Sequence, residues 1–450
     1  MNLRILHFAL IAAIAFTPAT FAQSKKSGGK KKTATTETSG ATTTAPAKKT
    51  GKKTREDTSN PAYANLPGIS TAAIPGDTPA PSTAGFIHPG ILVNAAQLDE
   101  IHRRVAANIE PQKTAFESMQ ASDYAAQNYT PKPCPAVVCG PMSNPDIGCK
   151  DEQRDCIAAY TQALMWAATR VPLYADNAIK IMNAWSATLK GGHADANAPV
   201  QSAWCAEMWP RAAEIIRYTY KTTDGKPAWP DAEIARFQNM LRTQYLPYVM
   251  HGDTENGNKE LAMADALIAI GIFNDDRAIY DLGVKMWRGR VPAAIYLKSD
   301  GPKPLDPPGC TATWSNKGLM PDLVDGLLQE TARDSGHAAF IFAATVNAAE
   351  TARQQGLDLY AEQGARIMAA MEFQTSHLKP NNVPFPPNLD FKRHPTWEIA
   401  FNHFHNRLGK PLPNTAAFLP TNRPTDTNHM MAWETLTHAD MGDIGLPPVK

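Results

Sequence analysis

Charged and polar residues gather immediately before an apolar run near position 340. The segment from Gln329 to His337 includes Arg333, and residues 338–349 behind it are apolar or small on nearly every side. A helix with this pattern has no water-facing side, so we predict an inner helix that starts at this segment. Unpaired N–H groups and the helix dipole favour anions at such an N-terminus. Arg333 and His337 are therefore candidates for chemistry on an anionic group.

A second polar group has the same layout. Asn258 and Lys259 open another strongly apolar stretch, and a turn and a returning helix lead from there to Arg290 and Tyr296. Two antiparallel helices bring Tyr296 back to the end at which Asn258 lies. If the inner helices run parallel to one another, His337 lies at that same rim. A simpler interpretation of Asn258 is a helix N-cap, a position at which asparagine is favoured.

The elements that must hold these residues are helices. Ten helical patterns recur along the chain, and strand-type alternation is almost absent. They cover residues 96–117, 153–169, 171–189, 203–220, 232–246, 259–272, 277–288, 337–355, 358–375 and 396–407. We predict an all-α protein of stacked antiparallel helix pairs, and periodicity alone does not say whether the pairs close into a ring.

Three segments of different composition divide the chain. Residues 1–22 have the basic start, apolar middle and small-residue end of a secretory signal peptide, with cleavage expected after Ala22. Residues 23–83 read as a disordered Lys/Thr/Ser/Ala/Pro-rich linker, and residues 84–450 as one domain. We expect a periplasmic or secreted protein without a membrane span. The first 55 residues carry a net charge of +10 against −9 for the rest, so this tail is either merely solvated or contacts an anionic envelope surface.

The number and spacing of the cysteines agree with an exported protein. Cys134, Cys139, Cys149 and Cys156 lie close together in the sequence, at spacings that match no standard zinc pattern. An exported protein favours disulfides, but four cysteines allow three pairings and the sequence does not choose among them. His403 and His405 give only a weak metal signal, so neither a metal nor another cofactor is expected.

Several function classes lack their motifs. The sequence contains no Gly-rich phosphate loop, no His-Glu-x-x-His and no Gly-x-Ser-x-Gly, which leaves nucleotide-binding, zinc-protease and serine-hydrolase functions without support. Nucleic-acid binding would rest on the lysine-rich tail alone and is not expected.

Four blocks of the sequence resemble a known family. They are FIHPGILVNAAQLDEIHRRV, GNKELAMADALIAIGIFNDDRAIYDLGVKMWRGRVPAAIY, QETARDSGHAAFIFAATVNAAETARQQGLDLY and TWEIAFNHF. Together they are similar to the alginate lyase domain family of polysaccharide lyases, over roughly residues 85–440. The resemblance implies an (α/α) toroid, an incomplete barrel of antiparallel helix pairs with a cleft for an acidic polysaccharide. It also implies β-elimination at a 4-linked uronate of the alginate or glucuronan type, without a redox cofactor.

This reaction needs three kinds of group. The C5 proton of a uronate is weakly acidic, so donors such as Asn258 and Arg333 must neutralise the adjacent carboxylate. A base then removes that proton, and an acid protonates the leaving O4. Tyr296 is the first choice for the acid and the base, since nearby basic residues lower the pKa of a phenol. His337 is the alternative base or a further carboxylate neutraliser, whereas an ordinary packed tyrosine is the alternative interpretation of Tyr296.

Two positions depart from the best-known branch of the family. There a histidine follows the asparagine, whereas Lys259 follows Asn258 here, and a tyrosine stands where this chain has Phe340. Phenylalanine has no proton to transfer. Either the base has moved to Tyr296 or His337, or the activity has been lost.

Other residues are candidates for substrate subsites: Trp204, Asn197, Gln201, Glu330, Arg290 and Lys259. An aromatic ring can stack on a sugar and amides can hydrogen-bond to it, although core packing is the competing interpretation of Trp204. The final cluster of His429, Trp433, Glu434 and His438 has helical spacing, so we predict that it packs a C-terminal helix.

Two other function classes remain open. An (α/α) glycoside hydrolase would use a carboxylate pair, such as Glu330 or Asp334 with Glu207 or Asp265. The second is a non-catalytic periplasmic polysaccharide-binding protein. Ultraviolet absorbance of an unsaturated product would separate elimination from both.

Overall fold

The computed structural model describes residues 57–80, 82–314, 322–385, 389 and 391–449. The described residues belong to one compact unit. The predicted signal peptide and residues 23–56 of the predicted linker lie outside the described residues. Within the described part, no helix has the length and apolarity needed to cross a bilayer.

Four long helices form an inner row. They are α3 (Cys149–Thr169), α5 (Ala198–Thr219), α8 (Gly257–Phe273) and α10 (Ser335–Gln354), and they pack side by side in that order. Every residue of α8 except Lys259 is buried, and α10 is buried without interruption from Ala338 to Ala352. The all-round apolar patterns therefore do mark inner helices, as predicted.

A second row covers the first. It contains α4 (Pro172–Thr188), α6 (Asp231–Met240), α9 (Arg277–Ala294), α11 (Leu359–Ser376) and α13 (Pro413–Asn422). Here α4 packs on α3, α9 on α8, α11 on α10, and α13 on α11. α8 and α9 pack closely, because Gly283 lets their backbones approach: a Cβ there would lie 2.8 Å from the carbonyl oxygen of Ala264.

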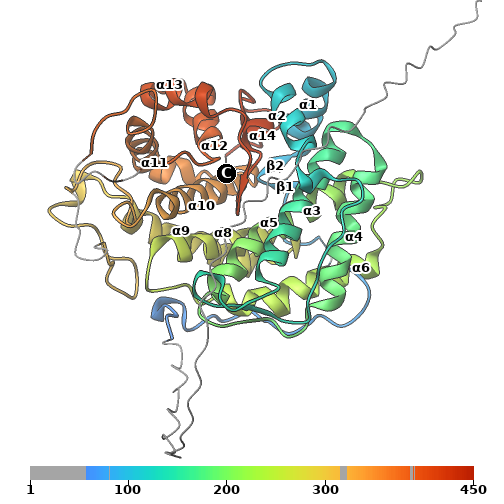
Figure 1. Ribbon diagram of the computed structural model, residues 1–450. Helices are drawn as coiled ribbons and strands as arrows, with labels where there is room; N and C mark the ends of the chain where they lie inside the picture. The colour runs from blue at the N-terminus through green and yellow to red at the C-terminus, as the bar shows by residue number, and fades with distance from the viewer. Residues whose placement is uncertain (1–56, 81, 315–321, 386–388, 390, 450) are drawn as a thin grey trace, which may run out of the picture. The chain divides into compact units, whose positions relative to one another are not determined.

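The two ends of the inner row are joined by the first and last elements. α14 (Glu434–His438) contacts α1 (Ala95–Ala106), α2 (Gln112–Gln120) and α12 (Glu398–Phe401), while α12 contacts α10 and α1 contacts α3. In Figure 1 the red C-terminal elements accordingly return beside the cyan N-terminal helices. The predicted (α/α) toroid is confirmed, and short helices complete its ring.

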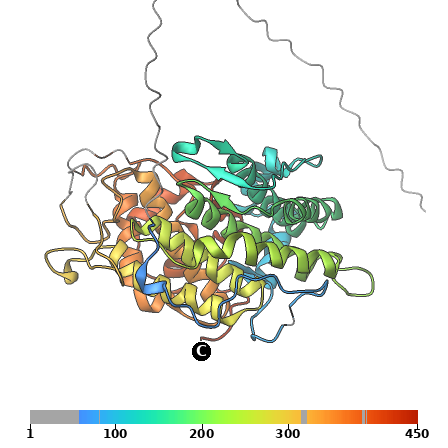
Figure 2. The ribbon, with the colours of Figure 1, turned by 90° about the horizontal axis from the view of Figure 1, so that it is seen from below.

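Strands in the described part are two or three residues long. β1 (Gly90–Ile91) pairs with β2 (Val93–Asn94), and β6 (Thr427–Asn428) with β7 (Met431–Ala432). β3 (Val137–Cys139) lies between β4 (Asp146–Ile147) and β5 (His193–Ala194), at the margin of the helical rows in Figure 2. These pieces shape loops at the rim.

Prolines and local irregularity explain where the observed helices differ from the predicted ones. The predicted helix 96–117 is two helices, because Pro111 lacks an N–H and disfavours helical backbone before it. The predicted helix 232–246 continues from α6 as a π-helical turn, Leu241–Tyr245, and α7 (Leu246–Val249). α12 likewise passes into a π-helical turn, Asn402–Arg407, whereas α9 runs six residues beyond the predicted end at 288, through Pro292.

Candidate active site

The N-terminal ends of three inner helices meet at one side of the toroid. Trp204, near the start of α5, lies against Phe340 in the second turn of α10, with ring centroids 5.3 Å apart. Asn258, in the first turn of α8, hydrogen-bonds to Glu330 just before α10. Inner helices that run parallel therefore place both polar groups of the sequence at one rim.

A continuous set of hydrogen bonds links the residues named for carboxylate neutralisation. The Asn258 amide donates to one carboxylate oxygen of Glu330, and Arg333 Nη1 donates to the other over 2.8 Å. Glu330 is buried, whereas the side chain of Arg333 is 41% exposed. The carboxylate of Glu330 thus fixes the directions of the amide and the guanidinium, and leaves other N–H donors of Arg333 toward solvent.

The start of α10 holds His337 in a similar way. Asp334 is the N-cap residue, with an extended backbone, and accepts a 2.9 Å hydrogen bond from the backbone N–H of His337. Its second oxygen lies 2.7 Å from His337 Nδ1. The hydrogen bond from His337 lowers the pKa of Asp334 well below its usual range. His337 is therefore oriented by a carboxylate that stays ionised at neutral pH.

Three aromatic side chains form one wall beside these polar groups. His429, in the two-residue loop between β6 and β7, has its ring centroid 4.2 Å from that of Trp204 and 5.1 Å from that of Phe340. The ring centroid of His337 lies 6.0 Å from that of Phe340. The sequence predicted that His429 packs the C-terminal helix. His429 instead lies in a hairpin that ends before α14 begins, and the helical spacing from His429 to His438 gave no sign of this hairpin.

Tyr296 is held at the same end but in a separate cluster. Its backbone pairs with Leu327, two residues before Gln329, whose side chain accepts from the N–H of Gly257. The Tyr296 ring is 4% exposed and packs with Trp314 and Leu327, and its hydroxyl donates to the carbonyl of Gly301 over 2.7 Å. The structure thus gives the phenol a structural partner, which competes with the catalytic role predicted for Tyr296.

The two other basic candidates are engaged with carboxylates. Arg290 is fully buried, where it pairs with Glu260 and donates to the Asp253 carbonyl. This corrects the expectation that Arg290 lines a subsite, because a guanidinium without exposed surface does not reach a polymer. Lys259 is partly exposed and pairs with Glu255, with Asp253 at 3.8 Å.

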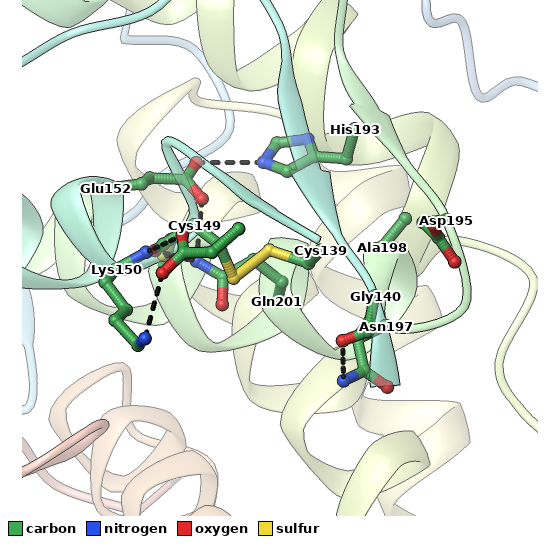
Figure 3. Close-up of a disulfide and its surroundings, with 12 residues drawn as sticks. Cys139, Gly140, Cys149, Lys150, Glu152, His193, Asp195, Asn197, Ala198 and Gln201 are labelled. Carbon is green, nitrogen blue, oxygen red and sulfur yellow. Dashed lines mark hydrogen bonds and ion pairs between the residues drawn. A yellow bond between two sulfur atoms is a disulfide. The ribbon is translucent and has the colours of Figure 1, made fainter. Parts of the chain in front are cut away.

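Asn197 and Gln201 secure the cysteine-rich loop (Figure 3). Gln201 is 3% exposed and donates to the Cys149 carbonyl and to Glu152, while Asn197 donates to the carbonyl of Gly140 over 3.0 Å. These partners explain both amides structurally, so Gln201 in particular is corrected from a subsite residue to a buried anchor.

A disulfide joins Cys139 to Cys149 and selects one of the possible pairings. Cys134 and Cys156 are free thiols in this structure. The predicted stapling of this loop is therefore confirmed for one of the two pairs that four cysteines can form.

The carboxylates invoked for hydrolysis lie inside the helical core. Glu207 is 0% exposed and Asp265 1% exposed, and both lie beside Arg211, whose Nη2 donates to Asp265 over 2.9 Å. Burial and the neighbouring Asp265 raise the pKa of Glu207 well above its usual range. Because neither group meets solvent, a hydrolytic pair that includes one of them has no access to a polysaccharide.

His403 and His405 also have packing partners, since their rings stack on Tyr360 and Phe401 with centroids 3.8 and 4.5 Å apart. Among the described residues, no cluster of His, Cys, Asp and Glu has the arrangement of a metal site.

A cavity of about 430 Å³ adjoins the start of α10 on the side of Arg333. Its lining residues are Thr331, Arg333, Asp334, Ser335, Gly336, Leu389, Lys392 and His394. Ser335 Oγ accepts from the backbone N–H of Lys392 over 3.0 Å and lies 3.1 Å from His394 Nε2. Burial lowers the pKa of His394. The cavity therefore combines two basic side chains with a neutral imidazole and a hydroxyl.

Comparison with known sequences finds one matching family model. Residues 100–306 match the sequence model of a family described as alginate lyase. This part of the chain is similar to the alginate lyase family. The protein is accordingly a polysaccharide lyase, although no curated protein matches its sequence significantly.

Solved lyases have the same fold. Alginate lyase A1-III from Sphingomonas species A1 is 17% identical with a TM-score of 0.52, and the match covers 82% of this chain and 99% of that enzyme. A variant of A1-III complexed with a tetrasaccharide is 16% identical, with a TM-score of 0.52 and coverage of 82% and 98%. An alginate lyase from Bacteroides ovatus is 14% identical, with a TM-score of 0.53 and coverage of 78% and 100%. At these identities the similarity shows the fold alone.

Proposed function

We propose that this lyase cleaves a 4-linked uronate polysaccharide of the alginate or glucuronan type by β-elimination. The observation that carries the proposal is the hydrogen-bonded set of Asn258, Glu330 and Arg333 beside the Trp204–Phe340–His429 wall. Donors held by a buried carboxylate can bind a substrate carboxylate, and aromatic rings can stack on a sugar. The tetrasaccharide complex of A1-III, an alginate lyase, agrees with an oligosaccharide substrate for this fold.

The polar groups suit the first step of elimination. Removal of the C5 proton places negative charge on the uronate carboxyl group, and donors that are already oriented stabilise this charge without reorganisation. Arg333 supplies a cation and Asn258 an amide, while His337 adds a ring nitrogen at the same rim. Carboxylate neutralisation is the role we assign to Arg333 directly, whereas Asn258, which is 2% exposed, supports it by holding Glu330.

A Tyr296→Phe substitution tests the phenol. Because the hydroxyl donates to the Gly301 carbonyl, we expect kcat to stay within about three-fold of the wild-type value. The free energy of unfolding should fall by ~1 kcal/mol, the contribution of one hydrogen bond. Kinetics on a uronate polymer and urea unfolding measure the two effects. A loss of about 100-fold in kcat with a stable fold would instead make Tyr296 the proton-transferring group.

The adjoining cavity is proposed as a subsite for a neighbouring uronate. Arg333 and Lys392 line it, and an exposed charge pair is worth ~1 kcal/mol, so Lys392→Ala should raise KM about five-fold with kcat unchanged. Lys410→Ala, which removes an exposed lysine outside the cavity, is the matched control. The difference should shrink at high salt, and equal KM values for both variants would remove the cavity from the subsites.

Elimination itself is tested by its product. An eliminase creates a C4–C5 double bond conjugated with the carboxylate, so alginate, glucuronan and related uronates should give rising ultraviolet absorbance. New reducing ends without absorbance would indicate hydrolysis, and binding without either would indicate a polysaccharide-binding protein. The experiment therefore separates all three function classes.

We also propose that the protein works in the periplasm or outside the cell. The support is the signal-peptide pattern of residues 1–22 together with the Cys139–Cys149 disulfide, a bond that persists in oxidising compartments. Its lysine-rich tail would then contact an anionic envelope surface or remain solvated.

A further inference from the structure

The chain keeps a histidine in an unfavourable backbone conformation beside Phe340. His429 occupies the first position of the two-residue loop between β6 and β7, with a φ of 54°. Hairpin loops that need a positive φ there favour glycine, and an L-residue costs ~1 kcal/mol in this region. Strain of this kind is kept where the surrounding structure or the function needs it.

The surroundings of His429 fix one tautomer. Its Nδ1 lies 2.7 Å from Oδ1 of Asn428, an atom that only accepts, so Nδ1 carries the hydrogen and Nε2 has the free lone pair. Arg211 holds the carbonyl of Met430 over 2.8 Å, which anchors the loop to α5. The His429 ring packs edge-to-face against the rings of Trp204 and Phe340. An imidazole held with Nε2 unprotonated is ready to accept a proton.

Its protonation state agrees with that role. Burial, followed by the charge of the nearby His337, lowers the pKa of His429 to about 4, so the ring is neutral at neutral pH. His337 is the titratable group that interacts with it electrostatically, and the other two neighbours of its ring, Trp204 and Phe340, carry no charge. A bound uronate carboxylate would favour the protonated ring and bring its pKa closer to neutrality.

We propose that His429 is the proton acceptor in the elimination, in the place that Phe340 cannot fill. This inference rests on the proposed function and deepens it. Nε2 takes the C5 proton, the C5 electron pair forms the C4=C5 double bond, and the C4–O4 bond breaks. The imidazolium then returns its proton to the leaving O4, so no other reactant is needed and the ring ends neutral.

His429→Asn tests the assignment, because asparagine tolerates a positive φ but is no base. We expect kcat on the uronate polymer that the wild type cleaves to fall at least about 100-fold, while the affinity for a saturated uronate tetrasaccharide, measured by calorimetry, changes less than about three-fold. The matched control is His405→Asn, which alters an exposed histidine stacked on Phe401 and should keep full activity.

A second variant keeps the test independent of any loss of folding. His429→Gly relieves the positive φ and leaves room for a ring, so added imidazole should restore part of its kcat.

Three results would overturn the inference: a His429→Asn enzyme within about three-fold of wild-type kcat, a kcat loss matched by an equal loss of tetrasaccharide affinity, or no imidazole rescue of a folded His429→Gly enzyme. A wild type that yields no unsaturated product from any uronate overturns the proposed function first, and the inference with it.

Discussion

Arg333→Ala is expected to lower kcat/KM on a uronate polymer by about 10²–10³-fold, the usual effect of removing one preorganised donor for a developing negative charge. The substitution acts twice. It removes the cation next to the substrate carboxylate, and it leaves Glu330 without the partner that Arg333 Nη1 provides. The freed carboxylate of Glu330 then repels an anionic substrate and holds only Asn258.

Initial rates from ultraviolet absorbance, with circular dichroism as a check of the fold, measure this effect. Arg333→Lys keeps the charge but loses the planar fork, so it should recover only part of the rate. Arg103→Ala is the matched control, because that arginine is exposed and its side chain pairs with Glu100 of the same helix, α1. If Arg333→Ala retains kcat/KM within about three-fold, Arg333 does not neutralise the substrate.

The largest expected effect on stability comes from Arg211→Met. Arg211 is the buried cation between Asp265 and Glu207, and its Nη2 donates to Asp265 over 2.9 Å. Removal of one partner leaves an uncompensated buried charge, which costs about 3–5 kcal/mol of unfolding free energy. Urea unfolding measures this loss, and Arg103→Met on the surface should change the same quantity by less than about 0.5 kcal/mol.

The loss should depend on pH. Burial raises the pKa of Asp265 even with Arg211 present, and removal of the guanidinium raises it further. A carboxyl group whose pKa is higher in the folded than in the unfolded state lowers the free energy of unfolding as the pH rises above the unfolded-state pKa. The stability of the variant should therefore be closest to that of the wild type near pH 4 and furthest from it at pH 7. An equal deficit at both pH values would place the cost in lost packing instead of the unpaired charge.

The inner helices were predictable because burial on all sides leaves a strong signal. The apolar run that follows His337 gave α10 and its N-terminal polar turn, and the run after Asn258 gave α8. The cap of α8, however, is Asn256, which accepts from the N–H of Lys259, so Asn258 lies inside the helix and is free to reach Glu330. Local capping rules cannot choose between two asparagines that are two residues apart.

Long-range contacts account for what the sequence did not reveal. Arg290 lies in a basic stretch that resembles a surface, yet Glu260 on the neighbouring helix draws it into the core. His429 reaches Trp204 across 225 residues of sequence, through a two-residue hairpin loop whose strands are too short to show a period of two. The contacts of such loop residues can be identified only in the folded structure, in which the first and last elements of the toroid meet.

The most direct test of lyase chemistry is the mass of the products. Wild-type protein is incubated with a saturated uronate oligosaccharide of defined length, and the fragments are separated and weighed while ultraviolet absorbance is followed. Elimination predicts two fragments whose masses add up to that of the substrate, one of them unsaturated at its new non-reducing end. Fragments whose masses together exceed that of the substrate by the mass of one water, without new absorbance, would contradict the proposed reaction.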